Sequence, residues 1–217
     1  MRIVLLGAPG AGKGTQCKRI AAKYGLVHLS SGDILRQERI AGSNLGKKAQ
    51  SYMDAGELVP DKIIVEMMAG AIKKAADSGF VLDGFPRTVN QAVELDKALT
   101  LAGQKINAVL NLEVNDQLIV RRMAGRRSCP KCGAVYHVEN LKPKAEGICD
   151  NDGAKLVQRP DDNAEVVAKR LKTYHQQTEP VVAYYKNNNT VYDIDANSTA
   201  DEVTAAIFEN LDAMVSV

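Results

Sequence analysis

The sequence predicts an α/β fold in which a parallel sheet of five strands is flanked by helices. Two observations predict it. Short runs of apolar and β-branched residues recur along the chain, and stretches with helical apolar periodicity separate them. Consecutive parallel strands need a crossover connection, and a helix usually supplies it. A chain of 217 residues is long enough for one such core with small insertions.

The strands are expected where the apolar runs are shortest and richest in β-branched residues: Ile3–Leu6, Val27–Leu29, Phe80–Leu82, Ala108–Val114 and Val191–Ile194. The helices between them are expected over Thr15–Tyr24, Asp61–Ala76, Thr88–Leu101, Asp116–Ala124 and Asn163–Lys186. Gly25 is predicted to end the first helix, and Asp61, after Pro60, to cap the next. Thr199 and Glu202 have the spacing of a capping box and predict a final helix.

The composition excludes several classes of protein. A net charge of +2 is too small for a general nucleic-acid binder, and no apolar run is long enough to span a membrane. The N-terminal "MRIVLLGAPGAGKG" has a short apolar run that Gly, Pro and Lys then interrupt, so it is interpreted as a strand and a loop. We therefore expect a cytoplasmic protein, in which paired cysteines favour metal binding over disulfides.

The loop after the first strand is the strongest single motif. "GAPGAGKGTQ" begins at Gly7 and leads directly into the first helix. Its glycines let backbone amides crowd around phosphate oxygens, Lys13 supplies a charge for the terminal phosphates, and the helix directs its positive end toward them. The pattern Gly-x4-Gly-Lys-[Ser/Thr] is nearly met, but Gly14 takes the place of the hydroxyl residue. This departure favours a Mg²⁺ ion held mainly by phosphates and water.

Further motifs follow in a fixed order: "SSGDILR", "GELVPD", "DGFPRTVNQA", "GRR" and "QRPDDN". Together with the glycine loop, they resemble the adenylate kinase family in its long-lid form. The resemblance implies a phosphate-loop core (1–29, 60–124 and 163–217) with two insertions. These are an AMP-binding segment, 30–59, and a zinc-binding lid, 125–162. It also implies transfer of a phosphoryl group from Mg-ATP to AMP, giving two ADP, and a monomeric protein.

The implied chemistry brings two polyanions together, so it needs cations that converge from several segments, above all arginine. By resemblance, Arg36 and Arg87 hold the AMP phosphate. Arg122, Arg126, Arg159 and Arg170 clamp the ATP phosphates and the transferred group, and Arg159 and Arg170 also reach AMP. Asp83, at the end of a strand, is expected to hold waters around Mg²⁺; capping the helix near Thr88 is the alternative. Asp161 and Asp162 are expected to orient Arg159 or to cap the following helix.

Other site residues are assigned by resemblance to the two nucleotides. The ATP site is expected to contain Gly10, Ala11, Gly12, Lys13, Gly14, Thr15, Arg126, Val135, Tyr136 and Ser198. The AMP site is expected to contain Ser31, Arg36, Glu57, Leu58, Val59, Gly84, Phe85, Pro86, Arg87, Gln91, Arg159 and Arg170. Pro86 is expected to follow a cis peptide bond. Gln91 lies one helical turn beyond Arg87, and its amide matches the donor and acceptor edge of adenine.

Three of the four cysteines lie in the lid, which has few apolar residues. Cys129 and Cys132 form C-x2-C, and Cys149 and Asp152 form C-x2-D, which is the pairing that a tetrahedral zinc site needs. His137 and Asp150 are the other candidates for the fourth ligand. Four protein ligands leave no open position, so the metal is expected to be structural and to replace a core.

Three other functions were weighed. A kinase for UMP, CMP or GMP is disfavoured by Gln91 and the long lid. A zinc-knuckle nucleic-acid module would need a basic knuckle with several aromatic residues, but Tyr136 is its only aromatic and its lysines are balanced by acidic residues. A switch GTPase would carry an Asn-Lys-x-Asp motif, which the sequence lacks. The expected partners are therefore ATP, AMP and ADP.

Overall fold

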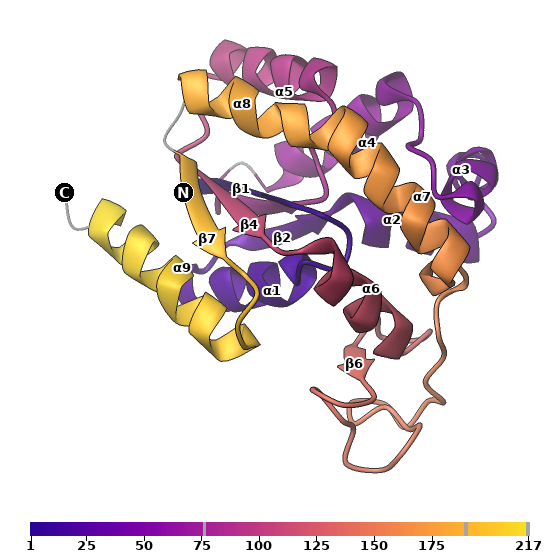
Figure 1. Cartoon of the computed structure of the whole chain (residues 1–217). Coiled ribbons are helices and arrows are strands. Elements are labelled where there is room, and N and C mark those ends of the chain that lie inside the picture. The colour runs from indigo at the N-terminus through magenta and orange to yellow at the C-terminus, as the bar shows by residue number, and fades with distance from the viewer. Residues whose placement is uncertain (76, 189–190, 216–217) are drawn as a thin grey trace.

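The computed structural model of the chain describes residues 1–75, 77–188 and 191–215. Its central sheet contains β1 (Arg2–Gly7), β2 (Val27–Ser30), β3 (Phe80–Asp83), β4 (Ala108–Glu113) and β7 (Val191–Asp195). The strands lie in the order β2-β3-β1-β4-β7, and neighbouring strands are parallel (Figure 1). The predicted α/β fold is confirmed, and each predicted strand agrees with the observed one to within a residue at either end.

Five helices correspond to predicted ones: α1 (Lys13–Tyr24), α4 (Asp61–Lys74), α5 (Val89–Leu101), α6 (Asp116–Gly125) and α9 (Ala200–Val215). Gly25 ends α1 in the left-handed conformation, as predicted. The capping box of α9 is confirmed, because the amide of Glu202 donates to the Thr199 hydroxyl and the amide of Thr199 donates to the Glu202 carboxylate. The prediction that α4 reaches Ala76 concerns a residue outside the described part of the chain.

The predicted helix over Asn163–Lys186 is confirmed in extent, because residues 164–188 are helical throughout, but the helix is irregular in its middle. The segment divides into α7 (Ala164–Thr173), the π-helix η2 (Tyr174–Thr178) and α8 (Glu179–Asn188). Pro180 explains the interruption, because it has no N–H to donate and its ring crowds the carbonyl group one turn earlier. The amide of Glu179 instead donates to the carbonyl of Tyr174, which closes the wider π turn.

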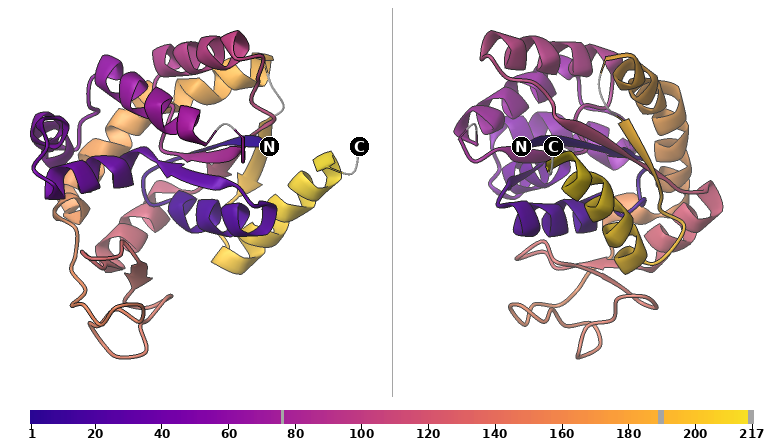
Figure 2. Two further views of the ribbon diagram at one scale, coloured as in Figure 1. Left: turned by 180° about the vertical axis from the view of Figure 1, so that it is seen from behind. Right: turned by 90° about the vertical axis from the view of Figure 1, so that its left-hand side faces the viewer.

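Helices cover both faces of the sheet (Figures 1 and 2), and the core has one apolar layer on each face. On one face Val4 and Leu82 pack with residues of α4, α5 and α8, including the buried Tyr185. On the other face Leu5 and Leu110 pack with residues of α1 and α9. Because both faces are covered, the strands are apolar on both sides. Among the helices that the structure describes, none has the length and apolar composition needed to cross a membrane.

Two segments extend beyond this layered core. Between β2 and α4 lie α2 (Ser31–Ile40) and α3 (Asn44–Ala55), which pack against each other. Between α6 and α7 lies the lid, with the short antiparallel pair β5 (Arg126–Ser128) and β6 (Val135–His137) and the 3-10 turn η1 (Pro160–Asp162). The lid projects away from the sheet, below it in Figure 1.

Candidate active site

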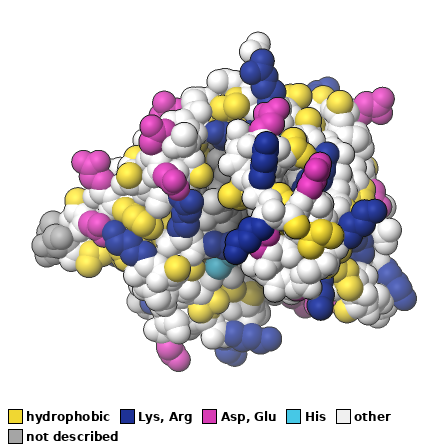
Figure 3. Space-filling model, turned by 90° about the horizontal axis from the view of Figure 1, so that it is seen from below, with side chains coloured by type: hydrophobic (Ala, Val, Ile, Leu, Met, Phe, Trp, Pro, Cys, Tyr) yellow, Lys and Arg dark blue, Asp and Glu magenta, His cyan; other side chains and the backbone are white. Residues whose placement is uncertain are grey.

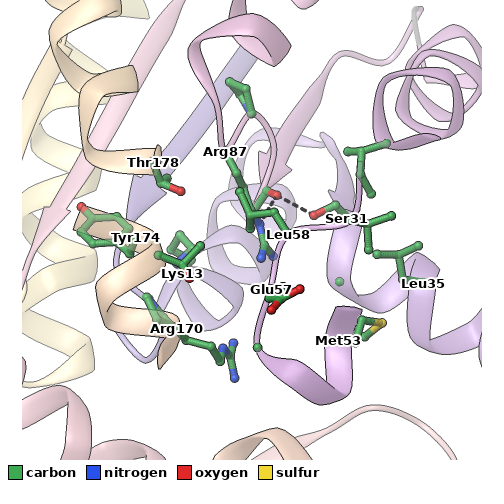
Figure 4. Close-up of a pocket in the computed structure, with 18 of the residues that line it drawn as sticks. Lys13, Ser31, Leu35, Met53, Glu57, Leu58, Arg87, Arg170, Tyr174 and Thr178 are labelled. Carbon is green, nitrogen blue, oxygen red and sulfur yellow. Dashed lines mark hydrogen bonds between the residues drawn. The ribbon is translucent and has the colours of Figure 1, made fainter. Parts of the chain in front are cut away.

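A pocket lies at the carboxyl ends of β1 and β3, where ligands of parallel sheets bind. Figure 4 shows Lys13 of the glycine loop and Arg87 of the loop after β3 in its wall. Arg170, Tyr174 and Thr178 come from α7 and η2 on one side, opposite side chains of α2 and α3. Thirteen residues named from the sequence line it: Gly7, Lys13, Ser31, Arg36, Glu57, Leu58, Val59, Gly84, Pro86, Arg87, Gln91, Asp161 and Arg170.

The glycine loop joins the end of β1 to the start of α1 and needs glycine for steric reasons. Gly10 has a φ of 85°, and a Cβ there would lie 2.9 Å from Cγ of Met123. Lys13, the first residue of α1, donates from Nζ to the carbonyl oxygens of Gly7 (2.7 Å) and Ala8 (2.8 Å). Burial lowers the pKa of this ammonium group to about 8. The loop therefore holds a desolvated cation at the end of the strand.

Asp83 ends β3 beside the glycine loop. A Cβ on Gly14 would lie 3.3 Å from Oδ2 of Asp83, and Nε2 of His28 lies 3.4 Å from the same oxygen. The alternative that Asp83 caps the helix near Thr88 is wrong, because Thr88 caps α5 with its own hydroxyl. The carboxylate is thus available beside the loop, and Gly14 leaves it the necessary space.

Arginines from three segments converge on the pocket. Nε of Arg87 donates to the Gly84 carbonyl at 2.7 Å, and burial together with the charge of Arg170 lowers the pKa of Arg87 to about 10. Arg170 pairs with Asp161 at 2.6 Å, and Arg36 pairs with Asp33. Seen from below, Lys and Arg side chains border a hollow in the molecule (Figure 3). Such convergence of like charges favours a polyanionic ligand.

The lid arginines have partners other than those predicted. Arg126 pairs with Asp162, whose side chain is fully buried, whereas Nε of Arg159 donates to the hydroxyl of Ser128 at 2.8 Å. Burial, reinforced by the charge of Arg36, lowers the pKa of Arg159 to about 10. Asp161 and Asp162 pair with Arg170 and Arg126, and the charge of Asp161 also acts on Arg159, so their orienting of Arg159 stays a prediction.

The alternative, that Asp161 or Asp162 caps the following helix, is wrong, because Asn163 caps α7 by accepting from the amide of Val166. Arg122 lies apart from the other arginines and donates from Nη2 to the carbonyl of Ser198 at 3.1 Å. The predicted ATP residue Ser198 is thus exposed beside the start of α9, next to a predicted phosphate ligand.

Two polar side chains near Arg87 are held by hydrogen bonds. Ser31, on α2, donates its hydroxyl to the Gly84 carbonyl at 2.6 Å. Gln91 is 1% exposed; its Oε1 accepts from the Arg87 amide at 2.7 Å and its Nε2 donates to Oδ1 of Asp61 at 2.7 Å. The predicted capping role of Asp61 is wrong, because Pro60 occupies the capping position and the Asp61 carboxylate contacts α5 instead. The Phe85–Pro86 peptide bond is cis, as expected.

The lid cysteines gather with Asp152 around one point. Sγ of Cys132 and Sγ of Cys149 lie 3.5 Å apart, and Sγ of Cys129 lies 3.3 Å from Oδ2 of Asp152. Tetrahedral zinc ligation would separate two sulfurs by about 3.8 Å and a sulfur and an oxygen by about 3.5 Å, so the residues fit this metal. The four ligand atoms all lie within 4.8 Å of one another.

The two halves of this cluster have the same local fold. The amides of Cys129 and Cys149 donate to the carbonyls of Ala134 and Ala154, each at 2.8 Å. Gly133 and Gly153 both have a φ of 71°. The repeated pattern C-x2-[C/D]-G-A was a signal for these glycines that the spacing of the cysteines alone did not include.

The other candidates for the fourth ligand have different partners. Nδ1 of His137 accepts from the amides of Glu139 and Asn140, and Oδ1 of Asp150 accepts from the amide of Lys144. Neither belongs to the cluster. Tyr136 packs inside the lid at 8% exposure, and its hydroxyl accepts from the Asp150 amide. A contact of Val135 and Tyr136 with the ATP adenine stays a prediction. Because the Tyr136 ring is buried inside the lid, that residue would make the contact mainly through its backbone.

Several pocket residues were missed at the sequence level. The members outside every motif include Met53, Ile64, Thr173, Tyr174 and Thr178. Tyr174 and Thr178 belong to η2, and Pro180 was the only local signal that the helix is irregular there. Met53, Ile64 and Thr173 lie on helices, and periodicity alone does not show whether such a side chain faces a pocket, the core or solvent.

Comparisons with known proteins agree with this geometry. A sequence model described as adenylate kinase matches residues 5–190. The adenylate kinase of Lachnospira eligens is 49% identical over 97% of this chain and the whole of that protein. The adenylate kinase of Agathobacter rectalis is 50% identical over 95% of this chain and 97% of its own length. That of Caldicellulosiruptor saccharolyticus is 53% identical over 86% of this chain and 87% of its own.

Proposed function

The chain belongs to the adenylate kinase family, and we propose how its residues divide the work of phosphorylating AMP with ATP. The observation that carries the proposal is the group of arginines around one pocket beside the glycine loop. The acceptor is a phosphate oxygen that is already anionic, so no strong general base is required. The protein has to bring two polyanions together and stabilise charge on the moving phosphoryl group.

On the ATP side, the backbone amides of residues 10–15 surround the phosphates, and Lys13 supplies the charge nearest the transferred group. Two observations support this role. The Lys13 ammonium group donates to the Gly7 carbonyl within the loop, and its burial makes an anionic partner favourable. The substrate is Mg-ATP, and Asp83 holds waters around its metal. Arg122 and Arg126 contact the ATP phosphates, while Val135, Tyr136 and Ser198 flank the adenine.

On the AMP side, Arg36 and Arg87 hold the phosphate, with Arg159 and Arg170 between the two nucleotides. The backbone of Glu57, Leu58 and Val59 and the loop from Gly84 to Arg87 line the same pocket. The Ser31 hydroxyl donates its hydrogen bond to the Gly84 carbonyl, so its oxygen can accept a hydrogen bond from the adenine amino group. Gln91 offers the complementary donor to the ring nitrogen.

The core (1–29, 60–124 and 163–217), the AMP-binding segment (30–59) and the lid (125–162) are proposed as separately moving parts. Closure would exclude water that could otherwise intercept the phosphoryl group. Two ion pairs support contact across the parts: Lys169 of α7 with Glu57 of the AMP-binding segment at 2.7 Å, and Arg170 of α7 with Asp161 of the lid at 2.6 Å.

We also propose that Cys129, Cys132, Cys149 and Asp152 hold one structural Zn²⁺ ion. The metal would supply the cross-link that the small apolar cluster of the lid does not. The structure describes all four cysteines of the chain and pairs none of them in a disulfide, which supports a reducing compartment, the cytoplasm, as the place of function. A monomer is proposed from the family resemblance.

The test is a coupled assay with ATP and each of AMP, GMP, CMP and UMP, with and without Mg²⁺. We expect turnover with AMP, and only when Mg²⁺ is present. Arg87→Ala should raise the KM for AMP by more than tenfold and leave the KM for ATP within about twofold, because its loop belongs to the AMP side. Equal losses for both nucleotides would contradict the assignment, and a preference for another monophosphate would favour the alternative substrate class.

A further inference from the structure

The carboxylate of Asp61 joins the start of α4 to the start of α5. Its Oδ2 accepts from the Thr88 hydroxyl at 2.9 Å and from Nδ2 of Asn90 at 3.0 Å. Its Oδ1 accepts from Nε2 of Gln91 at 2.7 Å. Asp61 itself is absent from the residues that line the pocket, whereas Gln91 is among them. The carboxylate therefore reaches the pocket only through its partner.

These contacts determine which way the Gln91 amide faces. A carboxylate only accepts hydrogen bonds, and the Arg87 backbone amide only donates one. Oε1 of Gln91 must therefore face Arg87, and Nε2 must face Asp61. If the amide turned over, Nε2 would face the Arg87 N–H, donor against donor, and Oε1 would face the Asp61 carboxylate, acceptor against acceptor. Among the hydrogen bonds of the described residues, Nε2 uses one of its two hydrogens on Asp61, so the other is left for a ligand.

We propose that Asp61 is a positioning residue for base recognition, because it holds the Gln91 amide with an N–H donor available to the pocket. The inference rests on the proposed role of Gln91 in reading the base. An N–H at this point favours a base with a lone pair on the facing ring nitrogen, such as N1 of adenine. Hypoxanthine and guanine carry a hydrogen on N1, and uracil carries one on N3, so each presents a donor to a donor. Asp61 thus acts on substrate choice without touching the substrate.

The experiment compares kcat/KM for AMP with kcat/KM for 1-deaza-AMP, in which a C–H replaces the ring nitrogen N1 and the amino group is kept. For the wild-type protein we expect AMP to be preferred about tenfold, the cost of one lost buried hydrogen bond. In Asp61→Ala the Gln91 amide loses the acceptor that holds Nε2 and keeps only the bond from the Arg87 amide, so the amide is less firmly held and the preference should fall severalfold. The loss should come from a higher KM for AMP, with kcat within about twofold of wild type.

Two variants separate positioning from a structural role. Asp61→Asn keeps an acceptor oxygen for Nε2 and should restore the preference. Asn90→Ala removes one contact of Asp61 but none of Gln91, so it should keep the tenfold preference even if the melting temperature falls. If Asp61→Ala does not fold, Asp61→Ser gives the same comparison, because its shorter side chain withdraws the acceptor from Nε2.

The outcomes distinguish this inference from the proposed function. If the wild-type protein uses AMP and 1-deaza-AMP equally well, Gln91 does not donate a hydrogen bond to N1, and the proposed role of Asp61 is overturned with it. A wild-type preference of tenfold that persists unchanged in Asp61→Ala would overturn the positioning role alone. Loss of the preference in Asn90→Ala as well as in Asp61→Ala would also overturn it, because the effect would then follow the packing of α4 against α5.

Discussion

The glycine loop follows a strand of the central sheet, whose residues are almost completely buried in the large apolar core. The lid has a much smaller core, a cluster of four buried residues: Cys129, Tyr136, Cys149 and Leu156. Two of these four are proposed zinc ligands. The loop therefore keeps its shape through apolar packing, whether or not a nucleotide is bound. The lid depends on side chains whose preferred partner is a metal ion. Changes in the core site should thus affect catalysis before stability, and changes at the lid cluster should affect stability before catalysis.

Lys13→Ala is the strongest test of the core half of this comparison. Loss of the charge should lower turnover by about 10²- to 10³-fold, because the Lys13 ammonium group lies directly at the glycine loop, where it donates to the Gly7 and Ala8 carbonyls. The melting temperature should not fall, since burying this ammonium group is itself unfavourable. Lys18→Ala, an exposed change on the same helix, is the control. Near-normal turnover in Lys13→Ala would remove the residue from the mechanism.

Cys132→Ser tests the lid half. Zinc content should fall from about one equivalent to less than a tenth, and the melting temperature should fall by about 5 °C or more, as expected for a loss of about 2 kcal/mol. Elemental analysis and thermal unfolding measure the two effects. Cys17→Ala, which changes a buried cysteine of α1, should keep its zinc. Equal zinc in wild type and Cys132→Ser would leave the lid cysteines without this role.

The pH dependence of Lys13 should separate catalysis from stability within the core. Its pKa of about 8 in the folded chain lies below the ordinary 10.5, so the unfolded chain binds more protons between these values. Stability contributed by this group should therefore rise with pH from about 8 to 10.5, while kcat/KM should fall about tenfold per pH unit above 8.

At saturating nucleotide the alkaline fall should move to higher pH, because bound phosphates raise the pKa of the ammonium group. Lys13→Arg keeps its charge and should lose the alkaline fall, even if its turnover is lower. The same fall in both proteins would assign the titration to another group. Rate profiles at low and at saturating ATP, with parallel unfolding measurements, provide the comparison.

Asp152→Cys should have the smallest effect. It replaces an oxygen ligand with a thiolate, which zinc accepts equally well, so zinc content should remain at about one equivalent and kcat within about twofold. Resistance to chelators should stay the same or increase. Loss of zinc in this variant would mean that the carboxylate has a structural role beyond ligation, such as its hydrogen bond from the Ala154 amide.

Features that depend on short stretches of chain could be predicted from the sequence. β1 is buried on both faces from Ile3 onward, so Ile3–Leu6 are all apolar, and the glycines after them allow the tight turns of the loop. The four residues of the proposed zinc site were recognisable because each pair forms within one tight turn. In all these cases, residues close in sequence determine the local conformation.

The tertiary structure alone decided which charged and polar groups meet. Asp161 and Asp162 adjoin Arg159 in sequence, yet they pair with Arg170 and Arg126. Asp61 follows Pro60 where a capping residue is expected, yet its carboxylate accepts from Gln91 of α5, thirty residues further along the chain. A charged side chain has several possible partners of equal chemistry, and only the packing of the helices brings one of them within hydrogen-bonding distance. Local patterns carry no record of that choice.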